Sequence, residues 1–295
     1  MPAQDADIVQ DARAPVAAAA DSTGPQIQPA GFLIQLSLDW IVLRASENVD
    51  DFLGQSHVTL IDEPLGRFVQ AQALHDLRNL FSRLSGSTGV ARAYRVRLAH
   101  DRPRFDIAFQ VSDGRVLLEG APSPERGLGE AMGSVAGLVD GLSAHRGEAL
   151  LEAAARRVRA LTGCDRALIL CRDDAGERSA HSSRGRFGDS SIVPDLPAIV
   201  ADAAAAPVPL FPRKAGGASI AGALLRSPSA GTLQRLGEQE IASAISVPLS
   251  VEGRELGIIQ CHSRSARAPR LELHAAAELF AQSFALRLEI DRLRG

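Results

Sequence analysis

The chain has 295 residues, of which 45% are apolar and 23% charged, and its formal net charge is −3. This length exceeds the common single-domain size of about 100 to 200 residues, so two domains are expected. The small negative charge offers no broad basic surface, and we expect no nucleic-acid partner. The longest clean apolar runs, such as Ala167–Cys171, are far shorter than the roughly 20 residues of a membrane span, and no secretory signal precedes them. We expect a cytoplasmic chain that does not cross the membrane.

The first third of the chain is typical of a small mixed domain. Residues 1–24 are rich in Ala, Asp and Pro and predict a flexible arm. Two short strands are expected at 32–38 and 41–46, followed by a short helix within 47–54 and one or two amphipathic helices within 64–84. Alternating patterns then predict three antiparallel strands at 91–99, 104–112 and 114–122, the last two joined by a hairpin turn at Asp113-Gly114.

Helical and strand patterns resume after this hairpin. Ser123 and Pro124 predict the start of a glycine-weakened helix, and 150–161 predicts a firmer one that ends at Gly163. Strands are expected at 165–173, 241–251 and 255–263, and a final amphipathic helix at 271–293. Such a terminal helix predicts a dimer bundle and a longer parent chain, although it could instead pack only on its own sheet.

No catalytic or metal-binding pattern accompanies these elements. Cys164, Cys171 and Cys261 are odd in number and lie in apolar runs, which favours buried free thiols. The scattered histidines have neither triad nor metal-ligand spacing. No lysine-serine pair follows the glycines at 216, 217 and 222, so they do not form a phosphate-binding loop. We therefore expect no enzyme activity in this chain.

Four stretches resemble the bacteriophytochrome family. Residues 27–31, IQPAG, resemble its IQPHG motif; 45–54 resemble its ASENxxxxLG; LRSPSAGTLQRL, 225–236, resembles LRSVSPxHxxYL; and GIIQCHS, 257–263, resembles GLIACHH. The resemblance implies an α+β fold in which a PAS domain precedes a GAF domain, each an antiparallel sheet flanked by helices, linked by a figure-of-eight knot. It implies an arm at 1–24, a PAS domain at 25–121, and a GAF domain with dimerisation helices at 122–295.

The same resemblance implies a pocket for biliverdin, a linear tetrapyrrole. Arg226 and Ser246 fall on propionate-binding positions, and His262 on the histidine beside the terminal ring. Asp195 falls on the aspartate of the family's DIP motif, and Thr232 on the position of the pocket histidine. Simpler interpretations remain open: His262 as a structural histidine, Arg226 in a surface ion pair, and Asp195 as the cap of a helix beginning at Pro197.

Departures from the family pattern predict a degraded pocket. No cysteine precedes Cys164, so the thioether through which the bacterial relatives attach biliverdin cannot form; Val16 stands near the expected place. Ala30, Arg235 and Ala244 replace polar residues of the family motifs, each removing a contact. The chain is also short between Pro197 and the segment 207–210, where the family has a further arginine and tyrosine.

We therefore expect the sensory input module of a bacteriophytochrome-like protein that binds biliverdin poorly, non-covalently or not at all, and is light-independent as a consequence. Expected partners are a second copy of the chain and its own output domain, such as a histidine kinase, or a response regulator. Two alternatives remain: a GAF cavity that takes another small molecule, and a purely structural dimerisation scaffold.

Overall fold

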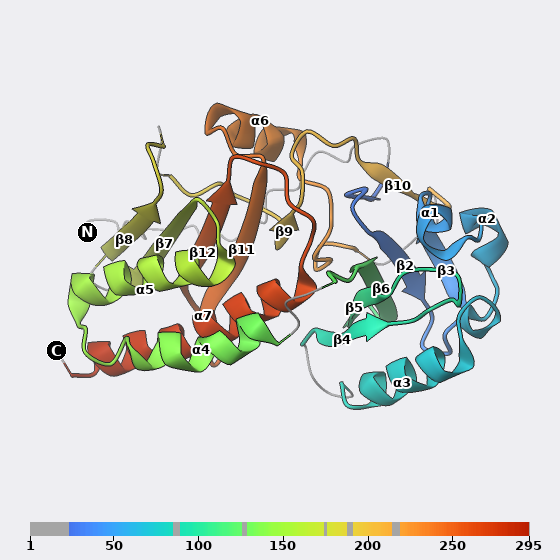
Figure 1. Cartoon of the computed structure of the whole chain (residues 1–295), viewed down its shortest axis with the longest axis horizontal. Helices are drawn as coiled ribbons and strands as arrows, with labels where there is room; N and C mark the ends of the chain where they lie inside the picture. Colours follow the sequence, from blue (N-terminus) through green and yellow to red (C-terminus); the bar gives the residue numbers. More distant parts are fainter. Residues whose placement is uncertain are drawn as a thin grey trace, which may run out of the picture.

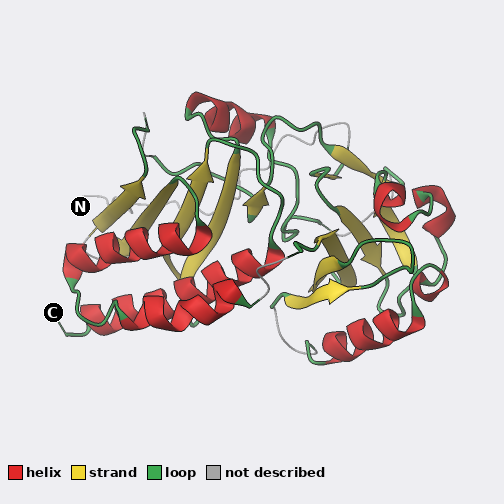
Figure 2. Ribbon diagram, viewed as in Figure 1, coloured by secondary structure: helices red, strands yellow, loops and turns green. Residues whose placement is uncertain are grey.

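The computed structural model describes residues 24–84, 89–125, 129–173, 176–187, 191–213 and 219–294. The expected flexible arm, apart from Gly24, lies outside the described residues. The described chain forms two antiparallel sheets, each flanked by helices, which confirms the α+β class (Figure 1, Figure 2). Among the described residues, no helix combines the length and hydropathy that a bilayer span requires.

The first sheet belongs mainly to the N-terminal domain. Its strands, in spatial order, are β1 (Gln26–Ile27), β10 (Val208–Phe211), β3 (Val42–Ser46), β2 (Phe32–Leu36), β6 (Arg115–Pro122), β5 (Phe105–Ser112) and β4 (Ala91–Val96). The accompanying helices are α1 (Val49–Leu53), α2 (His57–Leu60), the 3-10 turn η1 (Leu65–Arg67) and α3 (Ala71–Ser82).

Alternating apolar residues of these strands build the core of this domain. Phe32 packs edge-on against Phe105 with ring centroids 5.6 Å apart, and Trp40 packs in the same way against Phe81 of α3 at 5.8 Å. These strands and helices confirm the pattern expected over 32–122. The hairpin between β5 and β6 turns at Asp113-Gly114, where both residues have positive φ.

The second sheet forms the C-terminal domain. Its strands, in spatial order, are β8 (Gly176–Ser183), β7 (Arg166–Asp173), β12 (Arg254–Ser263), β11 (Ser243–Val251) and β9 (Ile199–Val200). Its helices are α4 (Glu130–Asp140), α5 (Gly147–Thr162), α6 (Ala230–Glu238) and α7 (Leu271–Arg292). Figure 1 shows α4, α5 and α7 lying side by side along one face of this sheet, away from α6.

Of the two helix boundaries predicted from local sequence in this domain, one is confirmed and one is wrong. The expected helix end at Gly163 is confirmed, because this residue caps α5 in the left-handed conformation with φ 64°. The expected helix start at Ser123 is wrong: α4 begins at Glu130. Ser123 instead continues the sheet, since its N–H donates to the carbonyl of Arg104 and its hydroxyl donates to the carboxylate of Asp106.

The N-terminal segment joins the two domains. Residues 26–27 pair with Val208 and Pro209 of β10, so a strand from the second domain completes the first sheet. On its other side the same segment bonds to residues 225–227, with Gln28 N donating to Leu225 O and Ser227 N to Gln26 O. Residues 25–28 therefore run between two segments of the second domain, as the expected knot requires. Residues 214–218 of the intervening loop lie outside the described residues.

Buried polar side chains reinforce this junction. The Gln28 amide donates to Ile199 O at 2.6 Å and accepts from Ala201 N at 2.7 Å. Glu119 of β6 is fully buried and accepts from both Leu224 N and Leu225 N, at 2.9 and 2.8 Å. Because these polar groups have partners across the junction, the two domains are held in one defined arrangement.

Candidate functional site

The second sheet has one face covered by helices and one face available for a pocket. Val247, Leu249, Ile259 and Cys261 pack into the core cluster shared with α5 and α7. Since side chains alternate along a strand, their neighbours on β11 and β12 face the other side. That face, which we call the pocket face, carries two of the predicted site residues, Ser246 and His262. Residues 193–203 and α6 cover it.

His262 is completely buried and neutral. Its Nδ1 accepts from Arg166 Nη2 at 2.9 Å, so its Nε2 carries the proton. Burial, and then the charge of Arg166, lower the His262 pKa to about 3. Nε2 is buried and has no hydrogen-bond partner in the described part of the chain. His262 is thus both structural, through Arg166, and left with one free donor.

Arg166 and Gln239 complete this buried group, and sequence reasoning did not find either. Arg166 is inaccessible to solvent, and its Nη2 donates to Gln239 Oε1 at 2.7 Å. Its guanidinium also stacks on the ring of Phe187, 4.5 Å from the centroid. A fully buried arginine with these partners holds strand β7, strand β12 and the end of α6 together.

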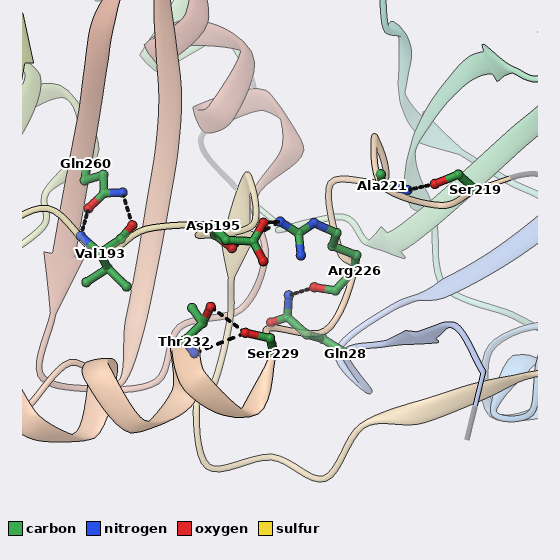
Figure 3. Close-up of polar contacts among 9 residues, drawn as sticks. All are labelled: Gln28, Val193, Asp195, Ser219, Ala221, Arg226, Ser229, Thr232 and Gln260. Carbon is green, nitrogen blue, oxygen red and sulfur yellow. Dashed lines mark hydrogen bonds and ion pairs between the residues drawn. The ribbon is translucent and has the colours of Figure 1, made fainter. Parts of the chain in front are cut away.

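Arg226 and Asp195 are brought together as an ion pair. Arg226 Nη2 lies 2.6 Å from Asp195 Oδ1 and 3.1 Å from the Asp195 carbonyl oxygen (Figure 3). The Asp195 side chain is 61% exposed, so the surface-ion-pair interpretation of Arg226 describes this structure. The capping interpretation of Asp195 is wrong, because no helix begins at Pro197. Asp195 has φ 51° in a turn, and the chain then enters β9.

Thr232 and Ser246 are both buried and engaged within the fold. Thr232 lies in the first turn of α6, where its N–H donates to Ser229 Oγ at 3.2 Å and its hydroxyl lies 2.9 Å from the same oxygen (Figure 3). This is an N-cap, which secures the start of the helix. Ser246 N donates to Ala198 O at 2.9 Å, and its carbonyl lies 3.3 Å from His274 Nε2.

Gln260 connects the pocket face to the segment that covers it, and sequence reasoning did not single it out. It stands where the family motif GLIACHH has alanine, which is the signal that could have identified it. Its side chain is fully buried. Its amide oxygen accepts from Val193 N at 2.9 Å, and its amide nitrogen donates to Val193 O at 2.8 Å (Figure 3). The residues around Val193 are thereby fastened to the sheet.

Apolar side chains pack beside this pair of hydrogen bonds between Gln260 and Val193, which we call the clamp. They come from the segment 193–200, from α6 and its following turn, and from β11, and they form one buried cluster of Val193, Leu196, Val200, Leu236, Ile241 and Ala244. The cavities in the described part of the chain include three of about 470, 510 and 280 Å³. None of the three is lined by Asp195, Arg226, Thr232, Ser246 or His262.

The three thiols lie on the opposite face of the sheet from this cluster. Cys164, Cys171 and Cys261 are free and buried, as expected, and all belong to the core cluster beneath α5 and α7. Burial raises the pKa of the Cys261 thiol, as does the neighbouring Cys164. No cluster of metal-ligating side chains is found among the described residues.

Comparisons with known proteins agree with this architecture. The PAS fold family model matches residues 21–122, and the GAF domain model matches residues 146–291. The chromophore-binding domain of the unusual bacteriophytochrome RpBphP3 from R. palustris is 24% identical, with a TM-score of 0.76 over 92% of this chain and 96% of that one. The chromophore-binding domain of Stigmatella aurantiaca phytochrome P1 is 24% identical, with a TM-score of 0.74 over 91% and 99%.

A longer structure extends beyond the region shared with this chain. The Stigmatella aurantiaca phytochrome photosensory core module is 24% identical, with a TM-score of 0.76, and 98% of this chain covers 61% of it. These likenesses concern the fold. Together with the two family models and the domain order, they show that the chain is a PAS–GAF module with a phytochrome-like fold.

Proposed function

We propose that this chain is the signal-input module of a longer signalling protein and that its own side chains close the pocket in which a tetrapyrrole would bind. It then binds biliverdin weakly, non-covalently or not at all, and its output does not depend on light. The observation that carries this proposal is the pair of hydrogen bonds between the Gln260 amide and the main chain of Val193.

This clamp opposes a bound chromophore in two ways. A ring system over the pocket face would have to displace Val193 and the apolar side chains packed with it. Moving Val193 would also break two hydrogen bonds of a fully buried glutamine, and unsatisfied buried polar groups cost about 1–3 kcal/mol each. The closed arrangement is therefore favoured unless the contacts of a bound ligand contribute several kcal/mol of favourable free energy.

The anchoring groups support the same conclusion. Attachment through a thioether needs a thiol beside the ligand, whereas the three thiols of the described chain lie in the core beneath α5 and α7. Arg226 would have to exchange Asp195 for a propionate. His262 retains a free Nε2 that could face a ligand, but its Nδ1 is committed to Arg166.

The terminal helix supports a dimer as the signalling unit. Leu279 and Leu286 of α7 and its C-cap residue Leu293 recur every seven residues. Ile290 lies between the last two, and all four side chains are at least 40% exposed. A stripe of this spacing is the pattern with which helices pair. We propose a homodimer through this helix bundle, with α7 leading toward the protein's own output domain or a response regulator.

The test is a biliverdin titration of three proteins: the native chain, Gln260→Ala, and Gln234→Ala as a control for loss of an exposed glutamine amide. Red and far-red absorbance is recorded before and after illumination, and zinc-enhanced fluorescence on a denaturing gel. We expect a spectrum like free biliverdin and no fluorescent band from the native chain and from Gln234→Ala. We expect tighter binding by Gln260→Ala, because Val193 is released. A reversible photochromic band in the native chain would overturn the proposal.

A structural dimerisation scaffold is the second candidate, and the same filled pocket favours it. The two candidates differ in whether the module responds to any input. If the output activity of the full-length protein is unaffected by deleting residues 24–262 while α7 is kept, the scaffold function is sufficient.

A further inference from the structure

A separate cavity of about 470 Å³ lies where three elements of the GAF domain meet. Its walls come from the C-terminal end of α5, from the adjoining strands β9 and β11, and from the segment 267–273 that enters α7. Figure 1 shows that β9 and β11 are neighbours in the sheet and that the chain runs from β12 down into α7 beside them. This volume lies within the range of about 300–1,000 Å³ that is usual for small-molecule sites.

The walls of this cavity are mainly apolar. Leu161, Ile199, Val200, Ile245 and Leu273 line it, and none of the residues that line it is acidic. Ser243 also lines it, but its hydroxyl already donates to Ser265 O at 2.8 Å. A ligand here would bury an apolar body and would meet no negative charge on the walls.

Two arginines line the cavity, and their situations differ. Arg267 is occupied: Nη2 donates to Gly163 O at 2.8 Å and Nη1 to Thr162 O at 3.2 Å, so it caps the carbonyl end of α5. Arg270 has no hydrogen bond or ion pair from its side chain within the described part of the chain, and its Nε is buried. Arg270 is therefore a guanidinium beside an apolar cavity, and no described residue forms an ion pair with it.

The unpaired Arg270 predicts that a ligand of this cavity is negatively charged. A guanidinium partly removed from water loses solvation, and this loss is compensated when an anion accepts its hydrogen bonds. Carboxylates match the planar fork of arginine and can accept two of its N–H groups together. A cationic ligand would be repelled, and a neutral oxygen would accept a weaker hydrogen bond from Arg270 than a carboxylate does.

We propose that this cavity is a binding site for a small organic carboxylate with an apolar body, whose carboxylate pairs with Arg270 while its body packs on Leu161, Ile245 and Leu273. The site shares none of the five residues predicted for a tetrapyrrole pocket. Val200 and Ala244 border both this cavity and the apolar cluster of the pocket face, so the two sites are neighbours with different polar groups. Because the ligand would touch both the end of α5 and the start of α7, its binding would stabilise the helix that leads to the output.

The experiment uses octanoate as the probe and 1-octanol as its neutral equivalent, titrated into the whole chain by calorimetry. Methyl chemical shifts of Leu161, Ile199 and Ile245 report the location. We expect saturable binding of octanoate with shifts at these methyls, and affinity for 1-octanol weaker by about tenfold or more. Equal affinity for the two probes, or octanoate shifts confined to other parts of the chain, would overturn the proposal.

Three variants make the test specific. Arg270→Gln should weaken octanoate binding by about tenfold or more and leave 1-octanol unchanged. Arg156→Gln removes an exposed arginine elsewhere on α5 and should change neither. Ala160→Trp, at an exposed position on the cavity rim, should block both probes without unfolding the chain, as judged by circular dichroism. Unchanged octanoate affinity in Arg270→Gln or in a folded Ala160→Trp would refute the site.

Discussion

Replacing Glu119 with glutamine tests how the two domains are joined. Glu119 is fully buried in strand β6, and its two carboxylate oxygens accept from Leu224 N and Leu225 N. Burial raises its pKa from 4.5 to about 7, although the two main-chain N–H groups oppose the rise. In Glu119→Gln one acceptor oxygen becomes an amide that donates, so one of the two N–H groups loses its partner.

The pH dependence of stability gives the magnitude of the contribution of Glu119 to the free energy of unfolding. The pKa of Glu119 is higher in the folded state than in the unfolded state, so between pH 4.5 and 7 the folded chain holds more protons. The contribution of Glu119 to stability is therefore complete below pH 4.5 and is lost as the pH rises toward 7. A shift from 4.5 to about 7 corresponds to about 3 kcal/mol. Glutamine does not titrate and has no such contribution.

The assay is urea unfolding of both proteins across pH 4.5–8, followed by the fluorescence of Trp40. Trp40 is the only tryptophan of the sequence and is buried in the PAS domain, which contains Glu119. The free energy of unfolding of the native chain minus that of Glu119→Gln should fall by about 3 kcal/mol between pH 4.5 and 7. Glu125→Gln, an exposed control, should show no such trend. A constant difference across this range would refute the assignment of a raised pKa to Glu119.

Three further predictions concern the contacts of α7 and the buried histidine. Arg92→Ala should destabilise the chain by about 1.5–3 kcal/mol in urea unfolding. Arg92 Nη2 lies 2.6 Å from Glu278 Oε2, and its loss removes the cation that pairs with this partly buried carboxylate. Recovery of less than half of the loss in Arg92→Met with Glu278→Met would contradict this explanation. The free energy of unfolding of the native chain should decrease as the pH falls from 6.5 to 3, because the folded state keeps His262 neutral while the unfolded state protonates it. His262→Gln should reduce this slope by about 1.4 kcal/mol per pH unit. An unchanged slope would count against the lowered pKa of His262. Leu286→Glu should give monomers in light scattering, whereas Leu38→Glu, at an exposed leucine of the PAS domain, should not; dimers of Leu286→Glu would exclude the α7 stripe as the interface.

Much of the secondary structure could be predicted because its causes are local. The β5–β6 hairpin follows from alternation and the Asp113-Gly114 turn, and the end of α5 follows from Gly163. The two helix starts expected at Ser123 and Pro197 are wrong, because their capping residues have partners elsewhere. Ser123 bonds to Asp106, and Asp195 pairs with Arg226. A capping pattern states what a side chain can do locally but not which competing partner it meets.

The short strands that join the domains had no local signal. β9 has two residues and β10 has four, and β10 pairs with β1 and β3, which precede it by more than 160 residues. Such strands exist because the rest of the fold presents a free strand edge to them. Propensity over two to four residues is too weak to predict them.

The sequence by itself determined the order of the domains, the motif positions and the absence of any cysteine before Cys164. Only the tertiary structure decided what the site residues do: Arg226 pairs with Asp195, Thr232 helps cap α6, and Gln260 holds Val193 over the pocket face. The physical reason is that a motif gives a residue type at a position along the chain. Hydrogen bonds and packing are settled between segments far apart in sequence, where each polar group takes the partner that the folded chain places within reach.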